Sequence, residues 1–548
     1  YPEAADWGVF SGNIMERTLD AIAYDGWFFE GFSYWNYTFQ FPAAFGAAQA
    51  RTVGGNAFEA NCFRYAPEYL AHMTLPDPRF VFDFGDWGPR VEKDGVGFQH
   101  GYDWPWHTLT TRVKSIAPSL LLRVHDGPVF LRDYLRHVTP KHADMTGIYT
   151  IDAIFGMLLQ LNPPQESEPM QAAYPDYPPY HYFPDMEVVH WRKNWRDAKA
   201  TAIAFKSGPP AGHHFTELLE QSPEWQPALG HAHPDAASFL LFSHGVFLAN
   251  DTGYTGAKES ADHNTILVDG IGQHEGGLAW TTFRGKPYEE YNKIRMENVW
   301  VAPRVAASTA VYQDAYVDTL KMTKMHRRLL LLDGRYLVVL DELSSELPHT
   351  YEWRLHTDRE PSEVGEGRYV MTNHPGQLVI QALDEIASAS TAPTIVETDP
   401  KADRSRPQQR GYHLAMRSPE EESFELLTAF CVQSAEESAS SFSAKKGQGS
   451  RIEMSDGSGS CSVWMRADES LRGNYAYLVR DEEGALIAAG LSGTSLSCDE
   501  LSIELTKPGE VTLERSENGA WRIESGSSPV TVTEPGSGAL VLEGRDAS

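Results

Sequence analysis

The residues best suited to chemistry in this chain are grouped between positions 230 and 270. His231 and His233 lie two residues apart, and Asp251 and His263 follow after short apolar runs. Alternate residues of an extended segment point to the same face, so the two neighbouring histidines are expected to face the same way. Imidazole and carboxylate groups are ligands that hold Zn²⁺ in proteins. Because His233, Asp251 and His263 each border an apolar run, a β-sheet could bring them together as metal ligands.

A second group of candidates lies in the stretch 25–37. Glu30 stands between two glycines there, and a helical pattern follows that opens with Tyr34, Trp35 and Tyr37. A tyrosine hydroxyl at the start of a helix, facing a cleft, could exchange a proton with a substrate. The same spacing also fits an aromatic stripe of the core, and both interpretations stay open on the pattern alone.

Two other interpretations of the histidine pair compete with the metal site. A histidine pair followed by Asp235 suggests a metal-dependent hydrolase, but the metallo-β-lactamase pattern requires a further histidine where Ala236 stands. The other alternative is that both histidines are satisfied by hydrogen bonds within a loop. The clustering of His231, His233, Asp251 and His263 in one short region favours the metal site over this alternative.

The first part of the chain has the apolar spacing of helices. Met15, Leu19 and Ile22 repeat at i, i+4 and i+7. Further helical patterns occupy the stretches 57–73, 108–122, 128–138 and 148–161. Aromatic loops rich in glycine and proline, such as 82–89, join them. Helix pairs with such loops on one side suggest an (α/α) toroid.

The pattern changes between residues 162 and 184, where repeated prolines end the helical spacing. Strand patterns follow, and the strongest is a hairpin of two apolar runs, 329–332 and 336–340, around Asp333-Gly334. Strand patterns also occupy 201–205 and 238–242.

Later segments are read as loops and a tail of short strands. The composition at 381–410 and 433–450 favours loops or linkers, and turn signals at 507–510 and at Asn518-Gly519 interrupt the tail. The predicted fold is α+β and multidomain: part of an (α/α) toroid at 1–165, an antiparallel β-sandwich with the metal site at 180–405, and a smaller C-terminal β-domain at 410–548.

The composition limits the kinds of partner. The chain has 548 residues, of which 41% are hydrophobic, enough for more than one core. No apolar run reaches the roughly 20 residues of a membrane span. The net charge of -29 argues against nucleic acid as a partner. The four cysteines have no metal-type spacing, are expected to be free thiols, and do not fix the compartment.

The two candidate stretches together resemble the heparinase II/III-like family of polysaccharide lyases, which includes heparin or heparan-sulfate lyases and alginate or oligoalginate lyases. Three further segments are similar to the start of that family's β-domain, to its next strand and to a later hairpin: 182–195, 204–209 and 326–341. The resemblance covers roughly residues 20–360. It implies a toroid followed by antiparallel β-sheets, and β-elimination at a uronic acid.

The resemblance also implies roles for single residues. Tyr34 matches the catalytic tyrosine, as acid and as a candidate base, and His231 matches a second acid/base group. Tyr37 lies one turn away and is the alternative catalytic tyrosine. The expected metal is one divalent ion, Zn²⁺ by preference, with a structural role, and its implied ligands are His233, Asp251 and His263. The residues expected to bind substrate are Glu30, Trp35, Tyr37 and Tyr254.

One feature of the family is missing from the sequence. The family neutralises the substrate carboxylate with an Asn/His pair upstream of the tyrosine, and only Asn13, without a histidine, precedes Tyr34 here. The toroid is also short at its start. Both observations favour a longer parent chain whose N-terminal segment would complete the site.

The expected enzyme is a carbon–oxygen lyase that acts on an acidic polysaccharide or oligosaccharide. The slight preference for alginate over sulfated glycosaminoglycans rests on the lack of a dense basic cluster, since the visible candidates are Arg284, Lys286, Lys293 and Arg295. The alternatives are a uronyl C5-epimerase and a non-catalytic carbohydrate-binding scaffold. A periplasmic or secreted location is expected, with a cytoplasmic one as the alternative, and a homodimer is a candidate assembly.

Overall fold

The computed structural model describes residues 4–31, parts of 34–100 and most of 178–543. The residues outside this description are 1–3, 32–33, 36–37, 40, 43–44, 47–48, 50–56, 74, 77–80, 83, 87–89, 94–96, 101–177, 223, 226–228, 276, 279–282, 284–285, 366, 398–406 and 544–548. The helices expected at 108–122, 128–138 and 148–161 lie outside it, as does the proline-rich stretch up to 177. The (α/α) toroid therefore stays a prediction.

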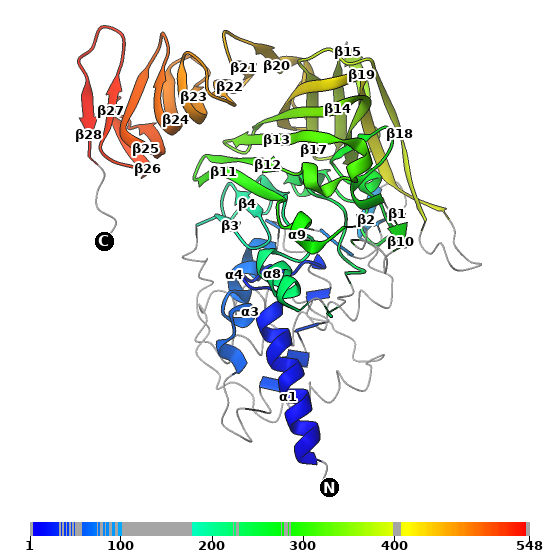
Figure 1. Cartoon of the computed structure of the whole chain (residues 1–548). Coiled ribbons are helices and arrows are strands. Elements are labelled where there is room, and N and C mark those ends of the chain that lie inside the picture. The colour runs from blue at the N-terminus through cyan, green and yellow to red at the C-terminus, as the bar shows by residue number, and fades with distance from the viewer. Residues whose placement is uncertain are drawn as a thin grey trace.

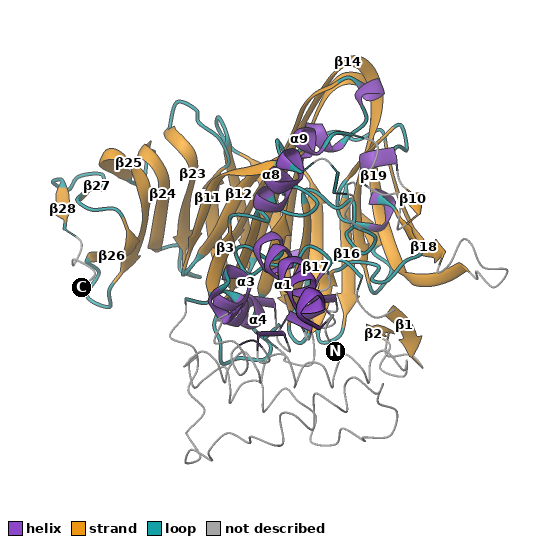
Figure 2. Cartoon of the chain, turned by 60° about the horizontal axis from the view of Figure 1, so that its bottom comes forward, coloured by secondary structure: helices purple, strands orange, loops and turns teal. Residues whose placement is uncertain are grey.

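Helices dominate the described N-terminal part (Figure 1). They are α1 (Ala4–Ala21), α3 (Asn61–Arg64) and α4 (Ala66–Met73). Leu19 and Ile22, two of the three residues whose spacing predicted a helix, are buried at the end of α1 and just beyond it. Figure 2 views the molecule with its lower end turned forward and shows these three helices in front of the strands. None of the helices that the structure describes is long and apolar enough to cross a membrane.

A five-stranded antiparallel sheet follows and carries much of the candidate site. Its strands, in spatial order, are β3 (Tyr180–Phe183), β4 (Val188–Arg192), β5 (Ala202–Lys206), β6 (Ser238–Ser243) and β7 (Val246–Ala249). The strands expected at 201–205 and 238–242 are confirmed as β5 and β6. Helix α8 (His213–Gln221) lies between them in the chain.

A ten-stranded antiparallel sheet forms the centre of the molecule. Its main path is β11 (Arg295–Ala302), β12 (Val305–Val311), β13 (Met322–Leu332), β14 (Tyr336–Thr357), β19 (Pro407–Ser434), β17 (Gly376–Ala382), β16 (Arg368–Asn373) and β15 (Ser362–Gly365). Two more strands pair with this path, β9 (Ile266–Val268) with β14 and β18 (Ser388–Glu397) with β19. Helix α9 (Tyr288–Tyr291) precedes β11.

The expected hairpin at 329–340 is confirmed. Strands β13 and β14 pair with Leu332 opposite Tyr336, and both turn residues, Asp333 and Gly334, have positive φ angles of 54° and 69°. Such angles match the twist of the flanking strands, which is why an Asp-Gly turn favours a hairpin. Leu329 packs in the core shared with the five-stranded sheet, whereas Leu330 packs in a second core on the other face. The continuous apolar run is therefore explained by a strand buried on both faces.

The second core joins the central sheet to a nine-stranded C-terminal sheet. Its strands are β20 (Ser443–Lys446), β21 (Arg451–Asp456), β22 (Gly459–Trp464), β23 (Leu471–Arg480), β24 (Leu486–Ser497), β25 (Ser502–Arg515), β26 (Trp521–Gly526), β27 (Val530–Thr533) and β28 (Leu540–Leu542). Two small sheets complete the described fold: β1 (Arg90–Lys93) with β2 (Gly97–His100), and β8 (Ala257–Lys258) with β10 (Gly277–Leu278).

Three expectations about the later chain differ from the structure. The stretch 381–410 includes β18, whose serines, alanines and threonines are partly exposed along a strand that pairs with β19. Because β19 continues to Ser434 in the central sheet, the sheets divide between residues 434 and 443 and not near 410. The turn expected at 507–510 lies inside β25, whereas the Asn518-Gly519 turn is confirmed before β26.

The N-terminal part docks on the β-sheets through buried polar contacts. The Asp25 carboxylate accepts hydrogen bonds from the backbone N–H groups of Asp185 at 2.8 Å and Met186 at 3.3 Å. Arg192 of β4 donates to the carbonyls of Ala71 and His72 in α4 at 3.2 and 3.3 Å. One hydrophobic core contains residues from both parts, so they form a continuous packed unit.

Three histidines lie at this junction, and their surroundings affect their protonation. His72 of α4 and His190 of β4 are buried, and the ring of His181 of β3 lies 5.3 Å from that of His72. Burial, followed by the neighbouring histidines and Arg192, lowers the pKa values of His72 and His190 well below the usual range. Burial lowers the pKa of His181 to about 4.

The junction is expected to lose stability as the pH falls. The three histidines are neutral when folded but take up protons near pH ~6.5 when unfolded, so their contribution is present above that pH and is lost below it. The melting temperature should fall between pH 7 and 5, and His190→Leu should make this fall shallower. The exposed His374 supplies the control, His374→Gln. Equal pH slopes for both variants and the native chain would contradict the assignment.

Candidate active site and metal centre

Buried polar groups hold the loop that carries the two neighbouring histidines. The residues before β6 form turns rather than the expected extended strand. The Gln273 side chain binds both backbone groups of Ala236, at 3.0 and 2.9 Å, and the Ser260 hydroxyl donates to the carbonyl of Pro234 at 2.8 Å. Because these partners are buried, the loop is fixed in one conformation.

An ion pair in the interior supports the same loop from the central sheet. Arg327 of β13 binds both carboxylate oxygens of Asp341 in β14, at 2.7 and 3.1 Å. Its guanidinium also donates to the carbonyls of Ala237 and Asn264, at 2.7 and 2.6 Å. On the loop itself, the Asp235 carboxylate lies 2.5 Å from the ammonium of the buried Lys206. These charges are therefore engaged in structure and are not available to a substrate.

The structure brings together the three residues expected to bind a metal. His233 comes from the loop before β6, Asp251 follows β7, and His263 precedes β9. Each offers one ligand atom, and these atoms all lie within 4.8 Å of one another. Nδ1 of His233 is buried and has no hydrogen-bond partner among the residues that the structure describes. Two imidazoles and a carboxylate are ligands that suit a divalent ion such as Zn²⁺, and Nδ1 of His233 has a lone pair that such an ion could accept.

The metal group also interacts within itself. Nδ1 of His263 lies 2.8 Å from the Asp251 carboxylate. Burial by itself would raise the pKa of Asp251, but His263 outweighs it and lowers that pKa. Burial by itself would lower the pKa of His263, but the charge and hydrogen bond of Asp251 raise it.

Asp86, which the sequence did not single out, connects the two neighbouring histidines. Its carboxylate lies 2.6 Å from Nδ1 of His231 and 2.9 Å from Nε2 of His233. Lys258 of β8 contacts the same carboxylate, and all atoms of both charged side chains are buried. Burial by itself would raise the pKa of Asp86, but Lys258 and the hydrogen bonds of the two histidines hold it well below its usual range.

Two glycines allow the segment with Asp86 to reach the site. Gly31 and Gly85 have positive φ angles of 83° and 76°, and their backbones approach each other closely. A Cβ atom on Gly31 would lie 1.9 Å from the carbonyl oxygen of Phe84, and one on Gly85 would lie 2.5 Å from that of Glu30. Any side chain at either position would therefore separate the two segments.

The expected catalytic pair is in direct contact. The ring of Tyr34 stacks on that of His231, with centroids 3.7 Å apart and an angle of 15° between the planes. The Tyr34 hydroxyl lies 3.4 Å from that of Tyr254, which is 39% exposed, so the group reaches the surface. Burial, the hydrogen bond with Tyr254 and the nearby Asp86 and Glu30 raise the pKa of Tyr34 far above its usual value. Tyr34 is therefore a neutral phenol that still carries its proton.

The other residues expected to bind substrate lie differently. Glu30 is buried, and burial followed by the charge of Asp86 raises its pKa to about 8. Trp35 has no exposed surface and stacks on Phe39 in the core. Tyr37 lies outside the described residues. Of the three that the structure describes, Tyr254 is the one placed at the surface beside Tyr34.

The basic residues considered for sulfate binding are paired with carboxylates. Lys286 lies 2.8 Å from Asp318, and Lys293 lies 3.8 Å from Asp314. Arg295 pairs with the neighbouring Glu297. Arg284, the fourth candidate, lies outside the described residues. The three that the structure describes are partly neutralised by their neighbours.

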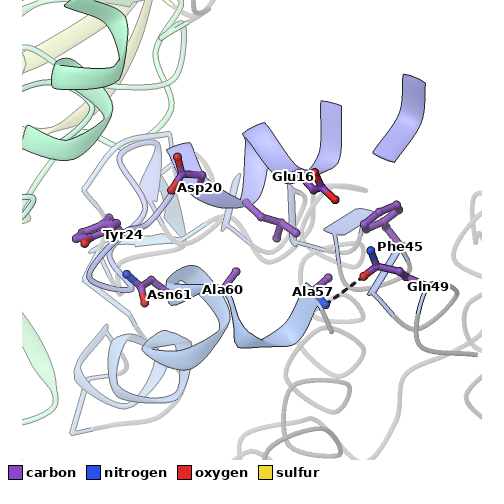
Figure 3. Close-up of a pocket in the computed structure, with 9 residues that line it drawn as sticks. Glu16, Asp20, Tyr24, Phe45, Gln49, Ala57, Ala60 and Asn61 are labelled. Atoms are coloured by element: carbon purple, nitrogen blue, oxygen red, sulfur yellow. Dashed lines mark hydrogen bonds between the residues drawn. The ribbon is translucent and has the colours of Figure 1, made fainter. Parts of the chain in front are cut away.

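A cavity of about 360 Å³ lies away from this site, beside α1 (Figure 3). Its lining residues are Glu16, Leu19, Asp20, Tyr24, Phe45, Gln49, Ala57, Ala60 and Asn61. None of these belongs to the metal group or to the Tyr34 and His231 pair. The acidic side chains on its wall would repel an anionic sugar, and the cavity is not assigned to the reaction.

Comparison with known proteins supports the family resemblance. Residues 176–425 match the family described as Heparinase II/III-like, C-terminal. This stretch contains the metal group, His231 and most of the central sheet. None of the curated proteins matches the chain. The resemblance predicted from the sequence is confirmed for this stretch.

Solved structures with a similar fold include proteins named heparan sulfate lyase and heparinase III. Heparan sulfate lyase HepC from Pedobacter heparinus has a TM-score of 0.53 and 14% identity, with 89% of this chain and 62% of that chain covered. A heparinase III structure has a TM-score of 0.56 and 12% identity, with 84% and 63% covered. The chain thus spans about three fifths of the length of these structures. At this identity the similarity establishes the fold alone.

Proposed function

We propose that this chain, whose residues 176–425 form a heparinase II/III-like C-terminal domain, is a lyase that cleaves uronate-containing polysaccharides by β-elimination. The observation that carries the proposal is the stacked pair of Tyr34 and His231, with the Tyr34 hydroxyl directed at the exposed Tyr254. A phenol and an imidazole in contact provide both a proton donor and a proton acceptor.

The reaction needs a base and an acid on one substrate. The base removes the weakly acidic proton at C5 of the uronate, and the acid protonates the glycosidic oxygen that leaves from C4. We assign the acid to Tyr34, because burial and the hydrogen bond with Tyr254 raise its pKa and keep the phenol protonated. His231 is then the base, and the hydrogen bond between its Nδ1 and the Asp86 carboxylate orients its ring. The enolate-like state that forms also requires a group that neutralises the substrate carboxylate.

A divalent ion held by His233, Asp251 and His263 would brace the loop before β6 and take no part in proton transfer. The ion is structural in this proposal, with Zn²⁺ as the first candidate. The (α/α) toroid at 1–165 also belongs to the proposal, since an N-terminal helical part that carries Tyr34 would face the β-sheets across the substrate.

The proposed substrate class is a glycosaminoglycan of the heparan sulfate type, because similar structures are named heparan sulfate lyase. Alginate, which the sequence favoured slightly, becomes the second candidate. It is kept because the described basic residues Lys286, Lys293 and Arg295 are paired with carboxylates, which disfavours dense sulfation. The localisation, periplasmic or secreted, and a homodimer belong to the same proposal.

Incubation of the full chain with heparan sulfate and with alginate tests the function. Elimination leaves a double bond conjugated with the carboxylate, so ultraviolet absorbance should rise with one of the two polymers. Exchange of the C5 proton with deuterated water, without that absorbance, would instead identify a C5-epimerase. Binding with neither change would identify a non-catalytic scaffold and overturn the proposal.

A further inference from the structure

Asp86 contacts both neighbouring histidines through different ring nitrogens. One oxygen lies 2.6 Å from Nδ1 of His231, and the other lies 2.9 Å from Nε2 of His233. The Asp86 backbone N–H also donates to the carbonyl of His231 at 3.3 Å. One buried side chain from the N-terminal part is therefore anchored to the loop by three contacts.

Lys258 determines what these contacts require of the two rings. Its buried ammonium contacts the Asp86 carboxylate and donates to the carbonyl of Thr255 at 2.5 Å. A carboxylate paired with a buried ammonium is ionised and can only accept hydrogen bonds. The ring nitrogen that each histidine directs at Asp86 must therefore carry a hydrogen atom.

We infer that Asp86 is a positioning residue that fixes opposite tautomers in the two histidines. His231 carries its hydrogen on Nδ1, which leaves Nε2 as the proton acceptor for the reaction. His233 carries its hydrogen on Nε2, which leaves Nδ1 as the metal ligand. This inference rests on the proposed function for the role of His231, but the tautomer of His233 concerns metal binding alone.

The surroundings of His233 agree with this assignment. Its Nδ1 is buried and has no hydrogen-bond partner among the described residues, as expected for a lone pair kept for a metal ion. Its ring centroid lies 5.0 Å from that of His263, a second member of the metal group. Histidine ligands commonly donate their other ring N–H to a carboxylate, which fixes the ring and strengthens the ligand.

The inference links the two parts of the chain. Asp86 lies just after Phe84, whose backbone carbonyl approaches Gly31 of the N-terminal part. Both histidines and Lys258 belong to the β-sheet part. The metal ligand and the base are thus both oriented by a residue of the N-terminal part.

The variant Asp86→Asn tests the inference because an amide cannot accept a hydrogen bond from both rings. Its oxygen can accept from one histidine, but its NH₂ group can only donate to the other, which must then change tautomer. With Zn²⁺ alone as the probe, competition against a chromophoric chelator should show an affinity about 10–100-fold lower than that of the native chain. With Zn²⁺ saturating, kcat should also fall about 10–100-fold, while KM changes little.

The matched control is Asp25→Asn. Asp25 is another aspartate of the N-terminal part that binds the β-sheet part, through the backbone of Asp185 and Met186, but no contact with either histidine is present among its described hydrogen bonds. A role of Asp86 in docking alone would make the two variants behave alike, with a lower melting temperature and unchanged Zn²⁺ affinity. That result would overturn the inference.

The tautomers can also be measured in the native chain, so this test does not require Asp86→Asn to fold. Nitrogen chemical shifts of ¹⁵N-labelled histidine rings distinguish the two tautomers, and the signals are assigned by their loss in His231→Ala and His233→Ala. We expect hydrogen on Nδ1 of His231 and on Nε2 of His233. The same tautomer in both rings would overturn the inference. If no polysaccharide is cleaved but both tautomers and the fall in Zn²⁺ affinity are found, the proposed function fails and the positioning role stands.

Discussion

Tyr34→Phe is expected to lower the turnover of the uronate polymer by about 10²–10⁴-fold, the usual contribution of a positioned acid or base. The phenyl ring keeps the stacking contact with His231, whose centroid lies 3.7 Å away, so the local structure should persist. Only the hydroxyl is lost, and with it the proton for the leaving oxygen. The measurement is kcat from ultraviolet absorbance, with polymer affinity measured separately and expected to stay close to native.

Two further tyrosines make this test specific. Tyr254→Phe removes the hydroxyl that lies 3.4 Å from Tyr34, so a smaller loss is expected from it. Tyr37→Phe addresses the alternative catalytic tyrosine, which lies outside the described residues. Near-native rates in Tyr34→Phe together with a large loss in Tyr37→Phe would move the role to Tyr37. Full activity in all three variants would reject a tyrosine as the acid.

Features of the fold with a local cause could be predicted from the sequence. The hairpin around Asp333-Gly334 is an example, because its two positive φ angles are preferences of those residue types themselves. The grouping of His233, Asp251 and His263 could also be predicted, since each borders a short strand of the same region. Strand edges that follow one another in sequence are often close in an antiparallel sheet.

Features set by distant contacts could not be predicted. Asp86 and Lys258 are 172 positions apart, so nothing local in the sequence pairs them. The aromatic and glycine-rich composition around residue 86 was a usable signal for a loop at a cleft, but it did not identify the carboxylate. Likewise, β18 has the composition of a linker and becomes a strand because β19 offers a pairing edge.

The structure also places the two histidines, to which the family resemblance gave different roles, in different surroundings. His231 stacks on Tyr34 and keeps some exposed surface, 14% of its side chain, whereas His233 is almost completely buried and joins Asp251 and His263. Accessibility is needed for proton transfer to a substrate, and burial suits a structural ligand. The division of roles therefore follows from position, although both residue types are the same.

His233→Ala is expected to abolish stoichiometric metal binding and to lower the melting temperature. Because the site forms only in the folded chain, a bound ion stabilises that state, by about 2.7 kcal/mol when its concentration is 100 times Kd. Elemental analysis of the native chain should give about one equivalent of metal. The three protein ligands and one further donor complete the coordination of a single ion. A chelator should lower the melting temperature of the native chain and leave that of His233→Ala unchanged.

His231→Ala is the matched control, because it removes a neighbouring imidazole that also contacts Asp86 but is not a ligand. It should keep its metal and most of its stability while turnover falls about 10²–10⁴-fold. Loss of metal with retained activity in His231→Ala would reverse the two roles and place His231 among the ligands.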